Sequence, residues 1–329
     1  MQRSNMILLW FVGFFVIIEL SCRAATSKTC DRHPLKLNTN AFKALGFSLI
    51  PCPCSNCDKT NFEKFVTFYY STNGINYYTD SNKAQLDLSR RTLIIIHGFC
   101  DSVSLEKPFW MVSLAEVMMS SAGYGNVILI DYSPFCCNYF TMSGKIAPKM
   151  GEYIADVIVS KGLKPNLVDA VAHSLGAHII GYAGSTLISK NHGSLNKIFA
   201  LCKAAVKFDG TNRGLNKTCA STVIDVISDN GDGFGSNELR GSVMYFLNPN
   251  SRIQPGCWLP NCNHQMCIQL FYASNVLKNF QNRHILRGTR CTEKHSSCPT
   301  NNENSKLSAL SGSDTGCFCV NTPECIPVS

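Results

Sequence analysis

Two short runs of the chain are apolar along their whole length, and they constrain the fold more than any other feature. Residues 93–96 are Leu-Ile-Ile-Ile, and residues 127–130 are Val-Ile-Leu-Ile. A strand of this kind has no polar face to turn toward water, so other elements must cover it on both sides. These runs predict a mainly parallel sheet with helices on both faces.

Strand-like and helix-like segments alternate along the middle of the chain, which is the pattern of an α/β domain. The predicted strands cover residues 66–70, 92–97, 127–131, 167–172, 197–201, 222–228 and 243–247, and the predicted helices cover residues 107–120, 145–161, 174–189 and 264–279. The second of these helices carries an apolar stripe at helical spacing. We therefore expect one α/β domain over residues 61–290, followed by a Cys-rich tail over residues 291–329 that disulfides hold together.

One predicted strand runs directly into a helix at Ser174. Ala172 and Gly176 lie two residues to either side of this serine. Small residues are needed there because the strand and the helix cross closely at a tight turn, which projects the serine Oγ from the sheet edge. The N-terminus of the helix then stabilises developing negative charge. The alternative is an ordinary helix start capped by Ser174, but the strand–turn–helix context favours a nucleophile.

Several motifs, in a fixed order, resemble the animal lipase family of pancreatic-type lipases and, most closely, insect secreted phospholipases A1. They are TLIIIHGF (92–99), NVILIDYS (126–133), VAHSLGAHIIGYAG (171–184), VIDVIS (223–228), NPNSRIQPGC (248–257) and CNH (262–264). The resemblance extends from about Val66 to about Cys298. It implies the α/β-hydrolase fold and the hydrolysis of a lipid ester.

The resemblance also implies roles for matched positions. Ser174 would be the nucleophile and His264 its general base. The backbone N–H groups of Phe99 and Leu175 would form the oxyanion hole. Cys257 and Cys262 match the pair of cysteines that encloses the family's lid.

The position of the family's triad acid holds a different residue. The family pattern Gly-Leu-Asp-Pro-Ala-x-Pro-x-Phe matches residues 200–208, and this places Cys202 at the Asp and Lys203 at the following Pro. A neutral thiol does not hold an imidazolium as a carboxylate does. In serine proteases, loss of the acid lowers the rate by about 10⁴-fold.

Three hypotheses remain open for this missing acid. The protein is a homologue with little or no esterase activity, or a Ser174–His264 dyad works slowly without an acid, or another carboxylate has replaced the lost one. Asp229 is the best substitute, because it ends the next strand and keeps the order Ser174, Asp229, His264. The competing interpretation of Asp229 is a loop residue in the turn-rich segment 229–233.

The predicted lid is short. Cys257 and Cys262 enclose only Trp258, Leu259, Pro260 and Asn261. A short lid resembles the phospholipase A1 members, because it leaves the serine open to a bulky phospholipid headgroup. Trp258 and Leu259 either touch a membrane or form a small apolar plug.

The amino-terminal residues 1–24 predict a secretory signal. Arg3 precedes the apolar run 6–20, and small residues occupy the positions before a cut after Ala24. The alternative is a membrane anchor, but the run is short for a span of about 20 residues. We expect a secreted, extracellular protein with a Cys-rich leader over residues 25–60.

Secretion makes the 18 cysteines disulfide candidates. Loss of Cys22 with the signal leaves 17, an odd number, and we expect Cys202 to be the one free, buried thiol. Cys52, Cys54 and Cys57 have ligand-like spacing, but a disulfide loop between prolines is the preferred interpretation, so no metal ion or cofactor is expected. Asn216-Lys217-Thr218 is a glycosylation sequon.

The net charge of +8 comes from scattered basic residues. This distribution disfavours a nucleic-acid partner and is compatible with peripheral binding to an anionic membrane or lipid surface. No obligate protein partner is evident.

Two classes of function therefore compete. The first is an ester hydrolase most like phospholipase A1, acting on phospholipid or another lipid ester. The second is a catalytically impaired homologue that serves as a lipid-binding, storage or venom-type protein. The presence of Ser174, His264 and Phe99 favours the enzyme, and the Cys202-Lys203 pair favours the impaired homologue. A protease inhibitor rests on the cysteine count alone.

Overall fold

The computed structural model describes residues 61–105, 109–135, 139–229, 234–249, 251, 253–255, 257, 260–277, 287–291, 304–306 and 315–321. The predicted signal and leader, residues 1–60, lie outside the described residues. None of the described helices combines the length and apolar character that crossing a bilayer requires.

The described strands form one ten-stranded sheet with the order β1-β3-β2-β4-β5-β6-β7-β10-β8-β9. Their bounds are β1 Thr67–Ser71, β2 Thr92–Ile96, β3 Asn126–Asp131, β4 Val168–His173, β5 Leu195–Leu201, β6 Ala220–Ile227, β7 Val243–Leu247, β8 Arg287–Cys291, β9 Asn304–Lys306 and β10 Gly316–Val320. Pairing is parallel from β3 through β7 to β10 and antiparallel at β1, β8 and β9. The carboxyl ends of the central strands therefore meet along one edge.

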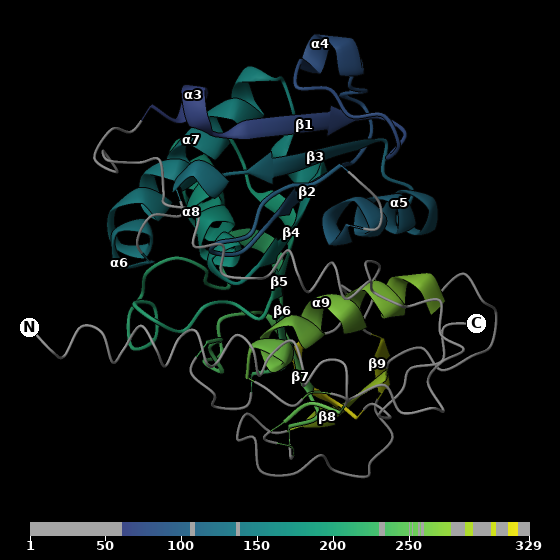
Figure 1. Ribbon diagram of the computed structural model, residues 1–329, viewed down its shortest axis with the longest axis vertical. Coiled ribbons are helices and arrows are strands. Elements are labelled where there is room, and N and C mark those ends of the chain that lie inside the picture. Colours follow the sequence, from purple (N-terminus) through teal and green to yellow (C-terminus); the bar gives the residue numbers. More distant parts are fainter. Residues whose placement is uncertain are drawn as a thin grey trace, which may run out of the picture.

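Helices cover both faces of this sheet, as Figure 1 shows: α7 and α8 lie on one side and α5 and α9 on the other. The α-helices are α3 Phe62–Phe65, α4 Ser81–Ala84, α5 Trp110–Ala122, α6 Tyr139–Thr141, α7 Ala147–Ser160, α8 Leu175–Ser189 and α9 Pro260–Leu277. Two 3₁₀ turns, η1 Ser133–Phe135 and η3 Pro165–Leu167, and a π-helical turn, η2 Met142–Ile146, complete the set. This arrangement is the α/β-hydrolase fold.

Alternate residues of the central strands contribute to two separate cores. In β2, Ile94 and Ile96 pack with α7 and α8, whereas Leu93 and Ile95 pack with α5 and α9. All four side chains are buried. The prediction that the wholly apolar runs are covered on both faces is confirmed.

Each predicted strand and helix is present, and most of the bounds agree within a few residues. The carboxyl-terminal region adds strands that the sequence patterns did not indicate. Strand β10 lies between β7 and β8 in the central sheet, although its sequence, Gly-Cys-Phe-Cys-Val, falls in the predicted tail. The sheet therefore extends into the segment set apart as a Cys-rich tail.

Candidate active site

The turn between β4 and α8 holds Ser174 in a strained backbone conformation. Its φ is 53° and its ψ is −120°, a region that non-glycine residues rarely adopt. A side chain at Gly176 would place its Cβ 2.4 Å from the carbonyl oxygen of His97, so only glycine fits. The predicted strand–turn–helix at Ser174 is therefore present, and the reason given for its small residues holds.

Asp229 and His264 meet at the carboxyl edge of the sheet. Asp229 follows the end of β6, and His264 lies in the second turn of α9. The Nδ1–H of His264 donates a hydrogen bond to Asp229 Oδ2 at 2.8 Å. Asp229 is fully buried, and His264 is 6% exposed. The acid proposed from strand order thus lies where an acid can fix the tautomer and orientation of His264.

Gly235 lies against the carboxylate of Asp229. A Cβ added at Gly235 would lie 1.9 Å from Asp229 Oδ2. The backbone of Gly235 is therefore in close contact with the acid, and it limits the positions that the carboxylate can take.

The first turns of α9 are fixed by side chains from the strand ends. His173, the last residue of β4, donates from Nε2 to the carbonyl oxygen of His264 at 3.1 Å. Cys267 donates to the same carbonyl at 3.3 Å, and Ser228 Oγ donates to the carbonyl of Asn263. These bonds hold the backbone that carries His264.

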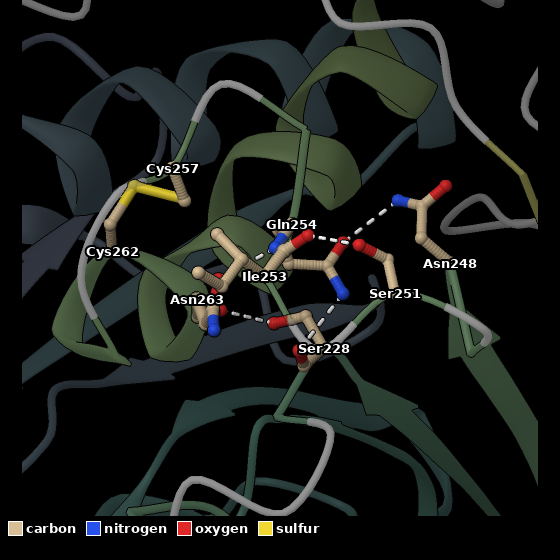
Figure 2. The surroundings of a disulfide bond; sticks show 8 residues. All are labelled: Ser228, Asn248, Ser251, Ile253, Gln254, Cys257, Cys262 and Asn263. Carbon is tan, nitrogen blue, oxygen red and sulfur yellow. Dashed lines mark hydrogen bonds between the residues drawn. A yellow bond between two sulfur atoms is a disulfide. The ribbon is translucent and has the colours of Figure 1, made fainter.

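Gln254 adds a second set of bonds beside the disulfide (Figure 2). Its backbone N–H donates to Asn263 Oδ1 at 2.7 Å, and its amide donates to the carbonyl of Ser228 at 3.0 Å. Asn248 in turn donates to Gln254 Oε1 at 2.8 Å. The motif NPNSRIQPGC therefore has a positioning role that the sequence alone did not reveal, because nothing in the motif indicates the side-chain partners of Gln254.

His173 and His264 lie close together, and the first of them stays neutral. Their ring centroids are 4.9 Å apart. Burial is the main cause that lowers the pKa of His173 to about 3, and repulsion by the neighbouring His264 adds to it. Among the described hydrogen bonds there is none between Ser174 and His264. In unliganded enzymes such contacts are often long and tighten when substrate binds.

The two residues predicted to supply the oxyanion hole follow β2 and begin α8. Leu175 is the first residue of α8, where backbone N–H groups have no acceptor within the helix. Phe99 follows Gly98, whose carbonyl accepts a hydrogen bond from His97 Nδ1 at 2.8 Å. That bond fixes the peptide unit between residues 98 and 99 and hence the direction of the Phe99 N–H.

Asp131 keeps His97 in this position. Burial lowers the pKa of His97, but the hydrogen bond to Asp131, 3.2 Å from Nε2, and the charge of Asp101 outweigh it and raise the pKa. The ring of His97 also stacks on Tyr132, with centroids 4.1 Å apart. The HGF motif thus includes a histidine that orients the loop.

Cys202 is buried at the end of β5, where the family pattern has its aspartate. Burial raises the pKa of this thiol well above its ordinary value, so the thiol is neutral. Its Sγ lies 2.8 Å from Ser228 Oγ. The expectation that Cys202 is the single free thiol is wrong, because Cys219 and Cys267 are also free and buried. An odd cysteine count reveals that a thiol is left over but not how many.

Lys203, the other departure from the family pattern, has a structural partner. Its Nζ lies 2.6 Å from Asp225 Oδ2, and both side chains are fully buried. It also donates to the carbonyl of Ser236 at 3.0 Å. The ion pair ties the end of β5 to the strand that leads to Asp229.

The implied lid disulfide is present between Cys257 and Cys262, with Cα atoms 5.5 Å apart. Trp258 and Leu259 lie outside the described residues. Phe234, which the sequence did not single out, has its ring centroid 6.0 Å from that of His264 and is 42% exposed. An exposed aromatic side chain thus stands beside the candidate base.

A family model described as Lipase matches residues 69–296. The chain belongs to the lipase family. Lipase member H of Rattus norvegicus is 30% identical to it over 205 residues, which cover 57% of this chain and 43% of the relative. Phospholipase A1 VesT1.02 of Vespa tropica is 27% identical over 203 residues, covering 56% and 65%. For Vespula maculifrons phospholipase A1 the identity is 27% over 209 residues, which cover 58% of this chain and 67% of the relative.

This lipase-family chain spans less than two thirds of the length of the first two of these relatives. Among solved structures, a putative hydrolase of the alpha/beta superfamily from Xanthomonas campestris matches with a TM-score of 0.32 and 16% identity, covering 45% of this chain and 76% of that one.

Proposed function

We propose that the protein is a secreted carboxylic ester hydrolase, most like phospholipase A1, that cleaves the sn-1 acyl ester of a phospholipid. The observation that carries this proposal is the 2.8 Å hydrogen bond between His264 Nδ1 and the buried carboxylate of Asp229. It supplies an acid although Cys202 occupies the family's acid position. The family match and the phospholipase A1 relatives support the substrate class.

The proposed reaction begins with attack by Ser174 Oγ on the ester carbonyl carbon. His264 Nε2 takes the serine proton, and Asp229 stabilises the imidazolium that forms. The N–H groups of Phe99 and Leu175 bind the oxyanion of the tetrahedral intermediate. His264 then protonates the departing glycerol oxygen, which leaves an acyl-Ser174. Water, activated by His264, releases the fatty acid and regenerates the serine.

The neutral His173 contributes to this chemistry by keeping the positive charge on one ring. With its pKa lowered to about 3, it lacks a second ring proton at neutral pH, and therefore has no positive charge to repel the imidazolium of His264. Its Nε2–H remains available to hold the His264 carbonyl.

We further propose that the protein acts while bound to the surface of a lipid membrane. Phe140 is 59% exposed and Val206 is 43% exposed. Tyr139, which precedes Phe140, joins the two segments by donating from its hydroxyl to the Val206 carbonyl at 3.0 Å. Lys207 Nζ lies 5.1 Å from the Phe140 ring centroid and adds a cation beside these apolar groups. Tyr139 packs edge-on against Phe99, 5.2 Å between centroids, so this surface leads to the proposed oxyanion hole.

Hydrolysis of phospholipid vesicles and of a short-chain soluble ester tests the reaction. Ser174→Ala and Asp229→Asn should both lose activity, while Ser189→Ala and Asp156→Asn, which alter exposed residues, should keep it. A phospholipid with two different acyl chains identifies the ester cleaved, and release of the sn-2 chain would contradict the assignment. If wild type and Ser174→Ala both give background rates, the fold serves as a lipid-binding scaffold instead.

The lipid surface has its own test. Phe140→Ser should lower vesicle hydrolysis about tenfold, through the loss of one inserted aromatic side chain, and leave soluble-ester hydrolysis unchanged. Ile188→Ser is the matched control, because Ile188 is 41% exposed at the far end of α8 from Ser174. Equal effects of the two substitutions on vesicles would argue against this docking surface. Secretion and glycosylation at Asn216 remain predictions that N-terminal sequencing and mass spectrometry of the mature protein would check.

A further inference from the structure

Three buried side chains with metal-binding atoms meet where the proposed acid and base of the triad lie. One ligand atom from each of Cys202, Asp229 and His264 lies within 4.8 Å of the others, and all three residues are buried. The thiol of Cys267, also fully buried, donates to the His264 carbonyl at 3.3 Å and so lies near this cluster without being part of it. Neither of these two cysteines is in a disulfide.

This set of donors matches the preferences of one class of cation. A thiolate, an imidazole nitrogen and a carboxylate oxygen suit zinc and similar soft divalent ions, which bind three protein ligands and a fourth ligand such as water. Hard cations such as Ca²⁺ and Mg²⁺ prefer sites made of oxygen ligands. The thiol of Cys202 decides this, because the aspartate of the family pattern would offer another oxygen in its place.

We propose that this cluster binds a soft divalent cation of the zinc class and that binding switches off ester hydrolysis. The effect on hydrolysis rests on the proposed function. The ion takes the lone pair of His264 Nδ1, a lone pair of the Asp229 carboxylate and the thiolate of Cys202, whose proton leaves to solvent. The proton that His264 carried on Nδ1 moves to Nε2. An imidazole with a metal ion on one nitrogen and a proton on the other has no lone pair to accept the proton of Ser174.

The burial of the donors predicts how the ion arrives. Cys202 and Asp229 have no exposed surface, and His264 is 6% exposed. An ion must therefore wait for a local opening of the structure before it reaches all of its ligands. We expect inhibition that develops slowly after mixing and that a chelator reverses slowly.

Binding can be measured apart from catalysis in the Ser174→Ala protein. Titration with Cd²⁺ should produce a thiolate-to-cadmium absorption band. The additional Cys202→Ala substitution should remove a fraction of that band and weaken the corresponding binding step at least about 100-fold, because even outer-shell partners of a metal contribute 10–100-fold. Cys219→Ala, which removes a buried free thiol elsewhere, should leave the titration unchanged. Identical titrations for Cys202→Ala and its parent would overturn the proposal.

Activity gives the second readout. In wild type and Cys219→Ala, Zn²⁺ should slowly inhibit soluble-ester hydrolysis, whereas within Cys202→Ala the rates with and without Zn²⁺ should agree. Cys202→Ser repeats the comparison if Cys202→Ala does not fold. Cadmium binding by a protein that hydrolyses no ester would refute the proposed function and leave the metal site standing. Hydrolysis that Zn²⁺ does not affect, in a protein without the Cys202-dependent band, would refute the metal site alone.

Discussion

Transfer of a carboxylate from residue 229 to residue 202 should restore hydrolysis to a protein that has lost its acid. Asp229→Asn keeps the shape of the side chain but no longer stabilises the His264 imidazolium, and we expect kcat to fall about 10⁴-fold. Adding Cys202→Asp to this variant places a carboxylate at the position that the family pattern assigns to the acid. The double variant should regain about 100-fold of the lost rate, or about 2.7 kcal/mol at 1.36 kcal/mol per factor of ten.

The structure supports recovery of this size. The ligand atoms of Cys202, Asp229 and His264 already lie within 4.8 Å of one another. An aspartate extends its carboxylate oxygens one bond farther from Cβ than cysteine extends Sγ. The backbone N–H of Ser228, whose nitrogen lies 3.4 Å from Cys202 Sγ, offers the new carboxylate a donor. Recovery should be incomplete because the surrounding segment has packed around a neutral thiol.

Soluble-ester hydrolysis at saturating substrate, with denaturant unfolding to verify the fold, provides the assay. Cys202→Asn in the Asp229→Asn background is the control, because it has similar shape without the charge and should give no recovery. The single variant Cys202→Asp holds two carboxylates around one imidazole. Repulsion between them raises the pKa of one carboxyl group, so it should retain its proton to a higher pH. The acid limb of the pH–rate profile should therefore shift to higher pH. Full activity in Asp229→Asn, or a folded double variant no faster than its Asn control, would refute this account of the acid.

Three further predictions concern packing and charge. Gly235→Ala should lower kcat about 100-fold by displacing the Asp229 carboxylate, whereas Gly144→Ala, with no atom near the added methyl group, should have no effect on the rate. Lys203→Met should lower the free energy of unfolding by about 3–5 kcal/mol because it leaves the buried Asp225 unpaired, and a urea titration that shows less than 1 kcal/mol would contradict this. Burial lowers the pKa of His178 to about 3. Its neutral ring donates from Nε2 to the carbonyl of Ala204 at 2.8 Å and accepts at Nδ1 from the N–H of Leu215 at 3.2 Å. The unfolded chain, with a histidine pKa near 6.5, then binds the proton first, so His178 should lower stability by about 1.4 kcal/mol per pH unit from pH 6.5 toward pH 3. His173 should add an equal contribution, and His178→Gln should reduce the measured slope by the share of His178.

Most of the fold was predictable because short, continuous runs of the sequence indicate its strands. The runs that became β2 and β3 have no polar face, and the strand–helix alternation around them allows few arrangements. Strand β10 was missed because its alternation of Cys, Phe and Val sits among cysteines, where a disulfide-rich tail was the stronger interpretation. Its partner β7 lies far away in the chain, and no local pattern reveals such a pairing.

The candidate site divides in a similar way. Ser174 and Asp229 could be found from their positions at strand ends, because the carboxyl ends of parallel strands share one edge. The contacts that hold His264 could not be found, because Ser228 bonds to Asn263 from 35 residues away and the side-chain bonds of Gln254 and Cys267 follow no sequence pattern. The pairing of Lys203 with Asp225 was equally hidden, because a lysine in place of a proline gave no hint of where its charge would go.

The position of β10 has a consequence for the order in which the protein folds during and after synthesis. This strand is the last one described in the chain, yet it lies between β7 and β8, to which it pairs in parallel and antiparallel fashion. Until residues 316–320 have been synthesised, β7 presents an open edge to other chains. Folding therefore finishes late, with a long-range pairing that is intrinsically slow. A chain cut near residue 290 would keep Ser174, Asp229 and His264 and should still aggregate.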